Sequence, residues 1–389
     1  MISTDMEERK GLKNRGYSHF DVDDRRQAVE EFTGKKLESI SKFCFDSEKA
    51  SKNIENMIGA TQIPLGCAGP VVINGDFAKG EFLVPLATTE GALVASINRG
   101  MSVINSGGGA RVKVFQDGMT RAPVFRTEGI DHSAKIIEWI NENEDMLSSV
   151  VDTTTNHGKL ISIESFPAGR NLFVRFTYGT GDAMGMNMAT IATEAVCKQI
   201  ENHTGAVMIS VSGNLCSDKK AAAINLIKGR GKSVIAEAII PKDVVENRLH
   251  ATVDAIIETN IRKNFVGSSL SVTMGANAHA ANMVAALYIA TGQDPAQVVS
   301  GSMATTMCED LNGDLYISVR MPSVEVGTVG GGTRLPSQSE ALSILGCLGD
   351  GMAKKLAEIV AVTVLAGELS TISAQAAGHL GKAHQELGR

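Results

Sequence analysis

The sequence predicts an α+β fold in which a small domain is inserted into a larger mixed α/β domain, behind a short helical N-terminal part. Three observations support this prediction. The first 54 residues are polar and contain helix-prone segments such as DDRRQAVEEFTGKKLESISKF. In the middle of the chain, apolar residues switch between a period of two and a period of about 3.6. After Ser212 the sequence combines strands with long helices rich in Ala and Gly.

The middle segment has the order strand, helix, strand, strand, helix, strand, which is the ferredoxin-like split βαβ pattern. These six elements are expected at residues 111–115, 132–143, 160–163, 172–176, 188–200 and 206–211. Outside this segment, we expect a helix from residue 90 to about 102 and two apolar helices near 351–366 and 369–377.

Changes in composition set the predicted domain boundaries. Residues 1–54 form a helical N-terminal region, residues 55–111 and 212–389 form the large domain, and residues 112–211 form the inserted domain. A chain of 389 residues has room for two or three domains, and 43% hydrophobic residues suffice for their cores.

The charge and cysteine content narrow the class of protein. A net charge of −6 argues against a general nucleic-acid or membrane-surface binder. The six cysteines form no C-x-x-C pair, so they signal neither a zinc site nor a disulfide framework and fit a reducing compartment. The charged N-terminus does not resemble a signal peptide. The uncharged stretch 264–293 contains several Ser, Asn and His residues that lipid would disfavour, so we expect buried protein interior. These features indicate a cytoplasmic protein.

Two glycine-rich segments are candidates for ligand binding. GTGDAMGMN, at residues 179–187, falls between a predicted strand and a helix, where free backbone N–H groups favour phosphate. Its glycine spacing is not that of the Rossmann fingerprint, and a plain turn is the alternative. GTVGGGT, at residues 327–333, is a second such cluster, and a loop is its alternative. KGRGKS, at residues 228–233, lacks the first glycine of a phosphate loop because Leu226 stands there.

Four titratable residues have ordinary structural readings when each is taken alone. Glu90 reads as a helix-start glutamate, and Lys219 reads as a solvated surface lysine. Asp294 precedes a proline and reads as a turn or cap residue. His384 reads as a histidine of the C-terminal tail.

Eight motifs between residues 55 and 384 together closely resemble the hydroxymethylglutaryl-CoA reductases. They are ENMIGATQIPLGCAGP, TTEGALVASINRG, GDAMGMN, SGNLCSDKKAAAINLIKGRGKS, NAHAANMV, GQDPAQ, MPSVEVGTVGGGT and GHLGKAH. The Ala-Gly-Pro ending of the first motif resembles class I, the mevalonate-forming class. The resemblance implies four-electron reduction of 3-hydroxy-3-methylglutaryl-CoA to mevalonate and CoA with two nicotinamide hydrides, by a large CoA-binding domain and an inserted ferredoxin-like cofactor domain.

The resemblance also implies the site residues, motif by motif. The catalytic residues are Glu90, Lys219, Asp294 and His384. The substrate contacts are Arg121, Ser212, Asp218, Lys220, Lys263 and Asn282. The CoA contacts are Ser96, Asn98 and Arg99. The cofactor contacts are Thr155, Asn156, Asp182, Met184, Gly185, Met186, Asn187, Gln293, Val329 and Gly330, and no metal is implied.

These residue types suit the chemistry. Hydride attack on a thioester carbonyl builds an oxyanion, which the ammonium of Lys219 can stabilise while Glu90 and Asp294 keep it charged. Glu90 then protonates the second alkoxide, and His384 protonates the CoA thiolate. Cationic Arg121, Lys220 and Lys263 suit the substrate carboxylate.

Two departures from the family bear on the cofactor and on membrane attachment. Thr155-Asn156 stands where eukaryotic members carry Ser-Arg near the 2′-phosphate of NADPH, so NADPH is expected and NADH stays open. The chain ends at Arg389, before the eukaryotic regulatory serine, and shows no membrane anchor. We therefore expect a soluble bacterial or archaeal form, assembled as a homo-oligomer (dimer or tetramer) with active sites between subunits. The same enzyme degrading mevalonate with NAD, and a ferredoxin-like nucleic-acid binder, are the alternatives.

Overall fold

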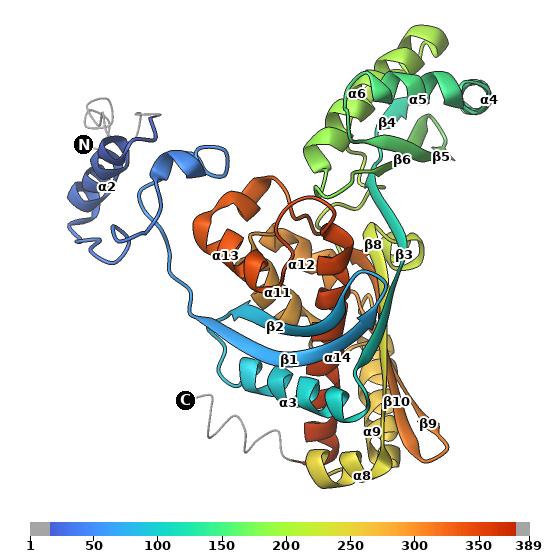
Figure 1. The fold of residues 1–389 in the computed structure, drawn as a ribbon. Helices are drawn as coiled ribbons and strands as arrows, with labels where there is room; N and C mark the ends of the chain where they lie inside the picture. The colour runs from blue at the N-terminus through green and yellow to red at the C-terminus, as the bar shows by residue number, and fades with distance from the viewer. Residues whose placement is uncertain (1–15, 379–389) are drawn as a thin grey trace.

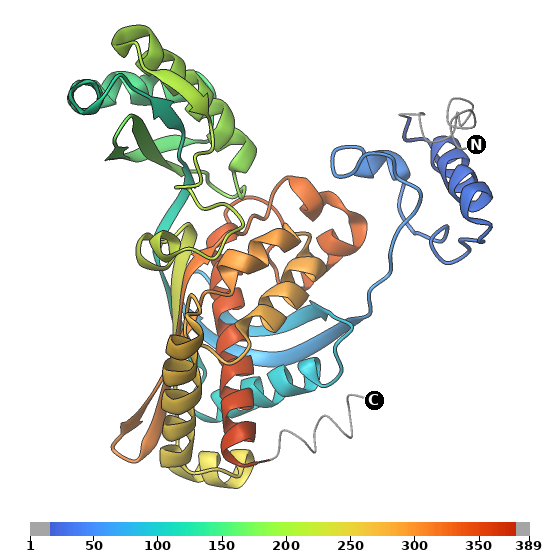
Figure 2. The ribbon, with the colours of Figure 1, turned by 180° about the vertical axis from the view of Figure 1, so that it is seen from behind.

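The computed structural model describes residues 16–378. Figures 1 and 2 show three parts: the N-terminal helix α2 to one side, a central body built around helix α14, and a smaller body at one end. The N-terminal part contains α2 (His19–Thr33) and the short helix η1 (Ser47–Ala50). Helix α2 begins at a capping box formed by Ser18 and Asp21, and it ends at Gly34 in the left-handed conformation. The expected helical N-terminal part is therefore present.

The central body combines a twisted sheet with helices. Its strands are β1 (Leu65–Gly75), β2 (Lys79–Ala87), most of β3 (Ala110–Arg121), β8 (Gly231–Ile240), β9 (Thr305–Leu311) and β10 (Asp314–Val324). Its helices are α3 (Leu93–Ser106), α7 (Ala223–Lys228), α8 (Lys242–Val244), η2 (Val245–Leu249), α9 (Val253–Thr259), η3 (Asn260–Gly267), α10 (Ser268–Ser271), α11 (Ala280–Thr291), η4 (Pro295–Gln297), α12 (Val298–Gly301), η5 (Gly331–Arg334), α13 (Pro336–Ile344) and α14 (Ala353–Ala376).

The smaller body has the ferredoxin-like order that the sequence predicts. Its elements are β4 (Val124–Arg126), α4 (Ile130–Glu142), α5 (Glu144–Asp152), β5 (Lys159–Ala168), β6 (Asn171–Gly179), α6 (Met186–Thr204) and β7 (Val207–Ser210). The strands pair antiparallel in the order β7-β4-β6-β5. Its first helical segment is broken at Asn143 into α4 and α5.

Strand β3 joins the two bodies, and here one prediction is wrong. Residues 111–115, expected to open the inserted domain, instead pair with β8 of the large sheet. Only the end of β3 pairs with β6, from Met119 to Arg121, and the first strand proper to the inserted body is β4. The alternation of apolar and polar residues cannot show to which sheet this strand belongs, because a strand that runs through two sheets has the same pattern as a strand that opens a domain.

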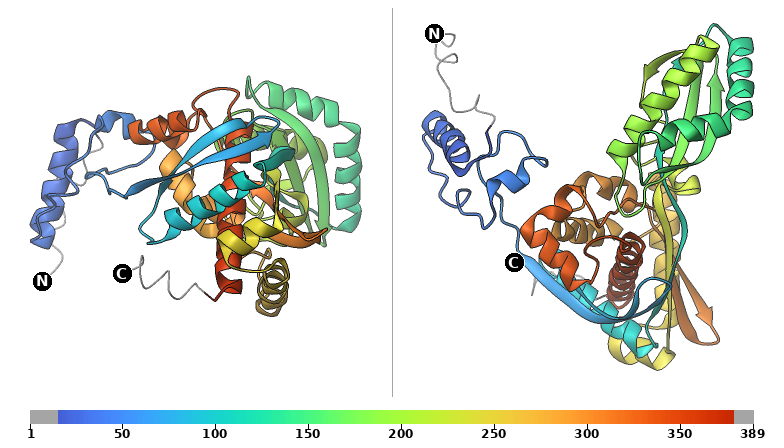
Figure 3. Two further views of the ribbon diagram at one scale, coloured as in Figure 1. Left: turned by 60° about the horizontal axis from the view of Figure 1, so that its bottom comes forward. Right: turned by 45° about the horizontal axis from the view of Figure 1, so that its top comes forward.

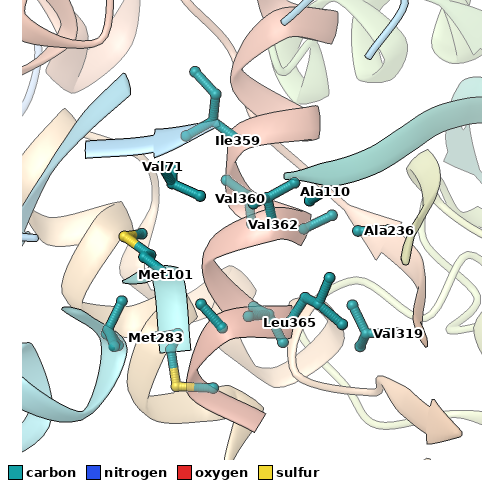
Figure 4. Close-up of a cluster of buried hydrophobic side chains, with 14 of the residues drawn as sticks. Val71, Met101, Ala110, Ala236, Met283, Val319, Ile359, Val360, Val362 and Leu365 are labelled. Carbon is teal, nitrogen blue, oxygen red and sulfur yellow. The ribbon is translucent and has the colours of Figure 1, made fainter. Parts of the chain in front are cut away.

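Helix α14 forms the centre of the main core. Figure 4 shows Ile359, Val360, Val362 and Leu365 among side chains from the sheet and from neighbouring helices. Although α14 is long and apolar enough to cross a membrane, 94% of its apolar window is buried inside the protein, which identifies a core helix. The two helices predicted near 351–366 and 369–377 are this single helix. Gly367 lies within this helix, where α11 packs so closely that a side chain would collide with Met283.

The uncharged stretch 264–293 is only partly interior. Helix α11 is buried along most of its length, as expected. Leu270 and Val272, however, are 82% and 76% exposed, so the expectation of a buried segment is wrong there. The helix expected from residue 90 begins at Leu93.

Candidate active site

Lys219 and Asp294 meet as an ion pair, with Lys219 Nζ 2.7 Å from Asp294 Oδ2. Lys219 lies in the loop between β7 and α7 and has a left-handed backbone (φ 55°). Asp294 follows α11, and its other carboxylate oxygen accepts the N–H of Ala296 and caps η4. The ordinary reading of Asp294 as a cap residue is therefore correct, and its second oxygen still binds Lys219.

Asp218, the neighbour of Lys219, is held by a buried arginine that sequence reasoning missed. Arg230 is fully buried, and its guanidinium contacts Asp218 at 3.1 Å and Glu325 at 3.0 Å. Gln297 donates to the same oxygen of Asp218. Arg230 belongs to KGRGKS, a segment that sequence analysis treated only as a failed phosphate loop. Burial raises the pKa of Glu325 to about 7, against the opposing charge of Arg230.

Three other predicted substrate contacts surround this loop. Arg121 ends β3, with its NH1 3.9 Å from Asp218 Oδ2. Ser212 Oγ lies 3.5 Å from Cys216 Sγ. Burial raises the pKa of the Cys216 thiol, but hydrogen bonds and the charge of Arg121 outweigh this and leave that pKa lowered. Lys220 is exposed and reaches the carbonyl of Asp218 at 3.4 Å.

A second cluster forms around Glu90. Asn282, in the first turn of α11, donates from Nδ2 to Glu90 Oε1 at 3.1 Å. The same nitrogen lies 3.3 Å from His279 Nδ1. Lys263 is near this cluster, since its Nζ lies 3.4 Å from the carbonyl of Ala278. His279 was not predicted as a site residue, although NAHAANMV contains it beside Asn282.

Helix α11 separates the two clusters. Asn282 lies near its start, and Asp294 lies just past its end. At a rise of 1.5 Å per residue, the 12 residues of α11 span about 18 Å. Among residues 16–378, no contact joins Glu90 to Lys219 within one chain. Within a single copy, Lys219 therefore contacts Asp294, one of the two carboxylates expected to keep it charged.

A cavity of ≈ 590 Å³ opens beside Asp294, between the two glycine-rich segments. Among the residues that line it are Asp294 and predicted cofactor contacts: Met184, Gly185, Met186, Asn187, Gln293, Val329 and Gly330. Gly185 has φ 88°, and a side chain there would collide with Thr180. Gly330 and Gly331 face open space. The start of α6 therefore presents backbone N–H groups beside the cavity.

The remaining predicted cofactor residues lie elsewhere. The carboxylate of Asp182 accepts the N–H groups of Gly351 and Ala353, so it tethers the loop before α6 to the start of α14. Thr155 accepts N–H groups within its own loop, and Asn156 is exposed on that loop. Neither Thr155 nor Asn156 lines the cavity.

The predicted CoA contacts are engaged within the chain. Ser96 and Arg99 of α3 both bond Ser370 of α14, and Asn98 accepts the N–H of Gly69. Burial lowers the pKa of Arg99. His384 lies outside the described residues.

A cavity beside a helix start and an adjoining ion pair are the features expected of an enzyme that binds a phosphate-bearing ligand and polarises a reacting group beside it. The model of the family "Hydroxymethylglutaryl-coenzyme A reductase" matches residues 21–389. The chain is 53% identical over 381 residues to the 3-hydroxy-3-methylglutaryl-coenzyme A reductase of Haloferax volcanii, covering 96% of this chain and 94% of that protein. It is 54% identical over 372 residues to the protein of that name from Methanocaldococcus jannaschii, covering 94% and 92%.

The chain therefore belongs to the hydroxymethylglutaryl-coenzyme A reductase family, and it reduces 3-hydroxy-3-methylglutaryl-CoA to mevalonate and CoA. A solved structure of the Streptococcus pneumoniae reductase has the same fold, with a TM-score of 0.70 at 18% identity, covering 94% of this chain and 98% of that one. A class II structure from that organism, described as bound to NADPH, has a TM-score of 0.71, also at 18% identity, and covers 90% and 86%.

Proposed function

We propose that Lys219, Asp294 and Glu90 carry out the chemistry of this reductase. The observation that carries the proposal is the 2.7 Å ion pair between Lys219 and Asp294, at the edge of a cavity that Asp294 itself lines. Lys219 is partly exposed, so it can donate to a substrate oxygen while Asp294 keeps it charged.

The cavity residues fit a nicotinamide dinucleotide. Backbone N–H groups at the start of α6 suit its phosphates, and Gly330 and Gly331 leave room beside them. Met184 to Asn187, Gln293 and Val329 would line the bound molecule. Two such molecules, bound in turn, would each supply one hydride, one for each reduction. Asp182 would act by fixing the loop, since its carboxylate is occupied by α14.

The chain's own residues then account for each proton and charge. Lys219 donates to the thioester oxygen as negative charge develops there, and again to the aldehyde oxygen of mevaldehyde. Glu90 gives its proton to the oxygen of the final alcohol. His384 protonates the CoA thiolate when the C–S bond of the hemithioacetal breaks. Arg121, Lys220 and Lys263 anchor the substrate carboxylate, and Ser96, Asn98 and Arg99 stay the proposed contacts of CoA.

A homo-oligomer, a dimer or tetramer, would complete the site. The Glu90 cluster and the Lys219 cluster lie at opposite ends of α11, a helix about 18 Å long. One carbonyl carbon cannot react at both places, so we propose that the Glu90 cluster of one copy faces the Lys219 cluster of another. Lys263 and Asn282 would come from the first copy, and Arg121, Ser212, Asp218 and Lys220 from the second.

Three finer assignments belong to the same proposal. We assign class I because of Ala68-Gly69-Pro70 at the end of the first motif. We retain the division into three parts, which the three separate hydrophobic cores support, and place the start of the inserted domain after residue 115, because Val112 belongs to the core of the large body. We also propose a cytoplasmic location without a membrane or nucleic-acid partner.

NADPH is the proposed cofactor, with NADH as the alternative. Asn156 stands where eukaryotic members carry an arginine near the 2′-phosphate of NADPH, so another cation would have to bind that phosphate. Arg175 is unsuitable for this because its side chain is buried and bonds Glu164 and Gly229. Lys159, exposed at the start of β5, is a second candidate close to that loop, and a third, Arg389, lies outside the described residues.

The test is oxidation of NADPH and of NADH, measured separately with 3-hydroxy-3-methylglutaryl-CoA. We expect turnover that depends on the thioester, with a higher kcat/KM for NADPH. Lys159→Ala should reduce the preference for NADPH over NADH, whereas Lys135→Ala, at an exposed position of helix α4, should leave that preference unchanged. A tenfold or greater preference for NADH would contradict the cofactor assignment, and no thioester-dependent oxidation would contradict the proposed site.

A further inference from the structure

A buried carboxylate in the core helix supports the Glu90 cluster. Glu368 of α14 is fully buried, and it accepts the N–H groups of Ala278 at 2.7 Å and of His279 at 2.9 Å. The hydroxyl of Thr306 donates to the same carboxylate at 2.8 Å. A buried charge needs such donors, and in return it fixes the backbone from which they come. Glu368 therefore fixes the position of His279 just before α11.

The ring of His279 is held at both nitrogens. Nε2 lies 3.3 Å from the carbonyl oxygen of Gly367 and also contacts the hydroxyl of Thr371, both on α14. Because a carbonyl oxygen only accepts, Nε2 carries the hydrogen in the neutral ring. Nδ1 is then an acceptor, and it faces Nδ2 of Asn282 at 3.3 Å.

This tautomer determines which way the amide of Asn282 points. Its Nδ2 has two hydrogens, one for His279 Nδ1 and one for Glu90 Oε1. With the amide reversed, its oxygen would face both the lone pair of Nδ1 and the carboxylate of Glu90. The ring therefore keeps a donor, and not an acceptor, directed at Glu90.

We propose that His279 is a positioning residue for the reductase reaction: held by Glu368 and by Thr371, it orients the amide of Asn282, which holds the carboxylate of Glu90. The inference rests on the proposed role of Glu90. It predicts a loss in kcat and not in cofactor binding, because the dinucleotide cavity lies at the other end of α11.

Two variants of His279 separate positioning from mere packing. His279→Asn places an amide oxygen near the position of Nδ1, where it can accept from Asn282. His279→Gln places its amide near the position of Nε2, where it can still bond Thr371, but leaves no acceptor for Asn282. For mevaldehyde reduction, we expect His279→Asn to keep kcat within about threefold of wild type. We expect His279→Gln to lose roughly 30- to 100-fold, at an unchanged KM for NADPH, the scale of a misplaced catalytic group.

If His279 served only to pack against α14, His279→Gln would lose less kcat than His279→Asn, because the glutamine keeps the contact to α14. The inference is overturned by near-normal kcat in His279→Gln, or by equal losses in the two variants. Thr371→Val removes only the outer contact of the ring and should lower kcat about three- to tenfold; if His279→Gln does not fold, this variant decides, and unchanged kcat there overturns the inference. Glu90→Gln separates the two proposals. If Glu90→Gln remains active, the proposed role of Glu90 itself is wrong. If Glu90→Gln is inactive while His279→Gln has a normal kcat, only the inference about His279 is refuted.

Discussion

Lys219 has a backbone conformation that L-residues rarely adopt, with φ 55°. Such a conformation costs about 1–2 kcal/mol and persists only where the surroundings impose it. Next to it, Arg230 and Gln297 hold Asp218 from the buried side, and Asp294 holds the lysine ammonium from the other. The strain is therefore located at the residue that is proposed to meet the substrate oxygen.

Replacing Lys219 tests its role directly. Lys219→Ala should lower kcat by about 10²- to 10³-fold for the thioester and for mevaldehyde alike, because both reductions place negative charge on oxygen. KM should change less, since Arg121 and Lys220 remain. Lys220→Ala is the matched control and should mainly raise KM. Steady-state kinetics with both substrates decide, and near-normal kcat in Lys219→Ala would exclude the lysine as the oxyanion donor.

The sequence predicts the site residue types well but not their partners. Asp294 follows from its motif, and its role as a cap residue follows from the proline after it, whereas its bond to Lys219 joins two segments that are 75 positions apart. Arg230 and His279 stand in motifs that sequence analysis quoted, yet nothing local distinguishes a buried arginine with three polar partners from a surface one. Asp182 was predicted as a cofactor contact, and its tether to α14 depends on long-range packing.

At the scale of elements, helix α14 connects features that are remote in sequence. One turn of it, Gly367 to Thr371, carries the carboxylate that fixes His279, the serine that binds Ser96 and Arg99, and the hydroxyl that meets the His279 ring. Figure 3 shows α14 passing through the middle of the central body. In the sequence, His384 comes eight residues after the end of this helix.

The proposed role of His384, protonation of the CoA thiolate, can be tested by comparing two substrates. A thiol pKa near 8.5 and an imidazolium pKa near 6.5 make proton transfer to the CoA thiolate favourable by about 2.7 kcal/mol. His384→Gln should lose most reduction of the CoA thioester yet keep most reduction of free mevaldehyde, which has no thiolate to protonate. Initial rates with the two substrates measure this. Equal loss of both would assign the histidine a structural role, and full retention of thioester reduction would exclude it from the reaction.

At the scale of the whole molecule, the ferredoxin-like order could be predicted because each element has its own period, whereas the path of β3 through both bodies could not. The continuity of α14 could not be predicted either, since a glycine inside an apolar run can lie within a helix or near its end. The close packing of Gly367 against Met283, which leaves no room for a side chain, is visible only in the structure. The exposed Leu270 and Val272 likewise contradict a simple interior reading of an uncharged stretch.

The central claim is that one active site takes Glu90 from one copy and Lys219 from another, and co-expression of two inactive variants tests it most directly. Glu90→Gln and Lys219→Ala chains, tagged differently and assembled at random into dimers, should regain about a quarter of wild-type activity. Half of the dimers are then mixed, and each mixed dimer contains one site with both residues intact. Each variant expressed alone should stay inactive. If the purified mixed dimers show no more activity than either variant alone, Glu90 and Lys219 act within the same chain, and the shared site is wrong.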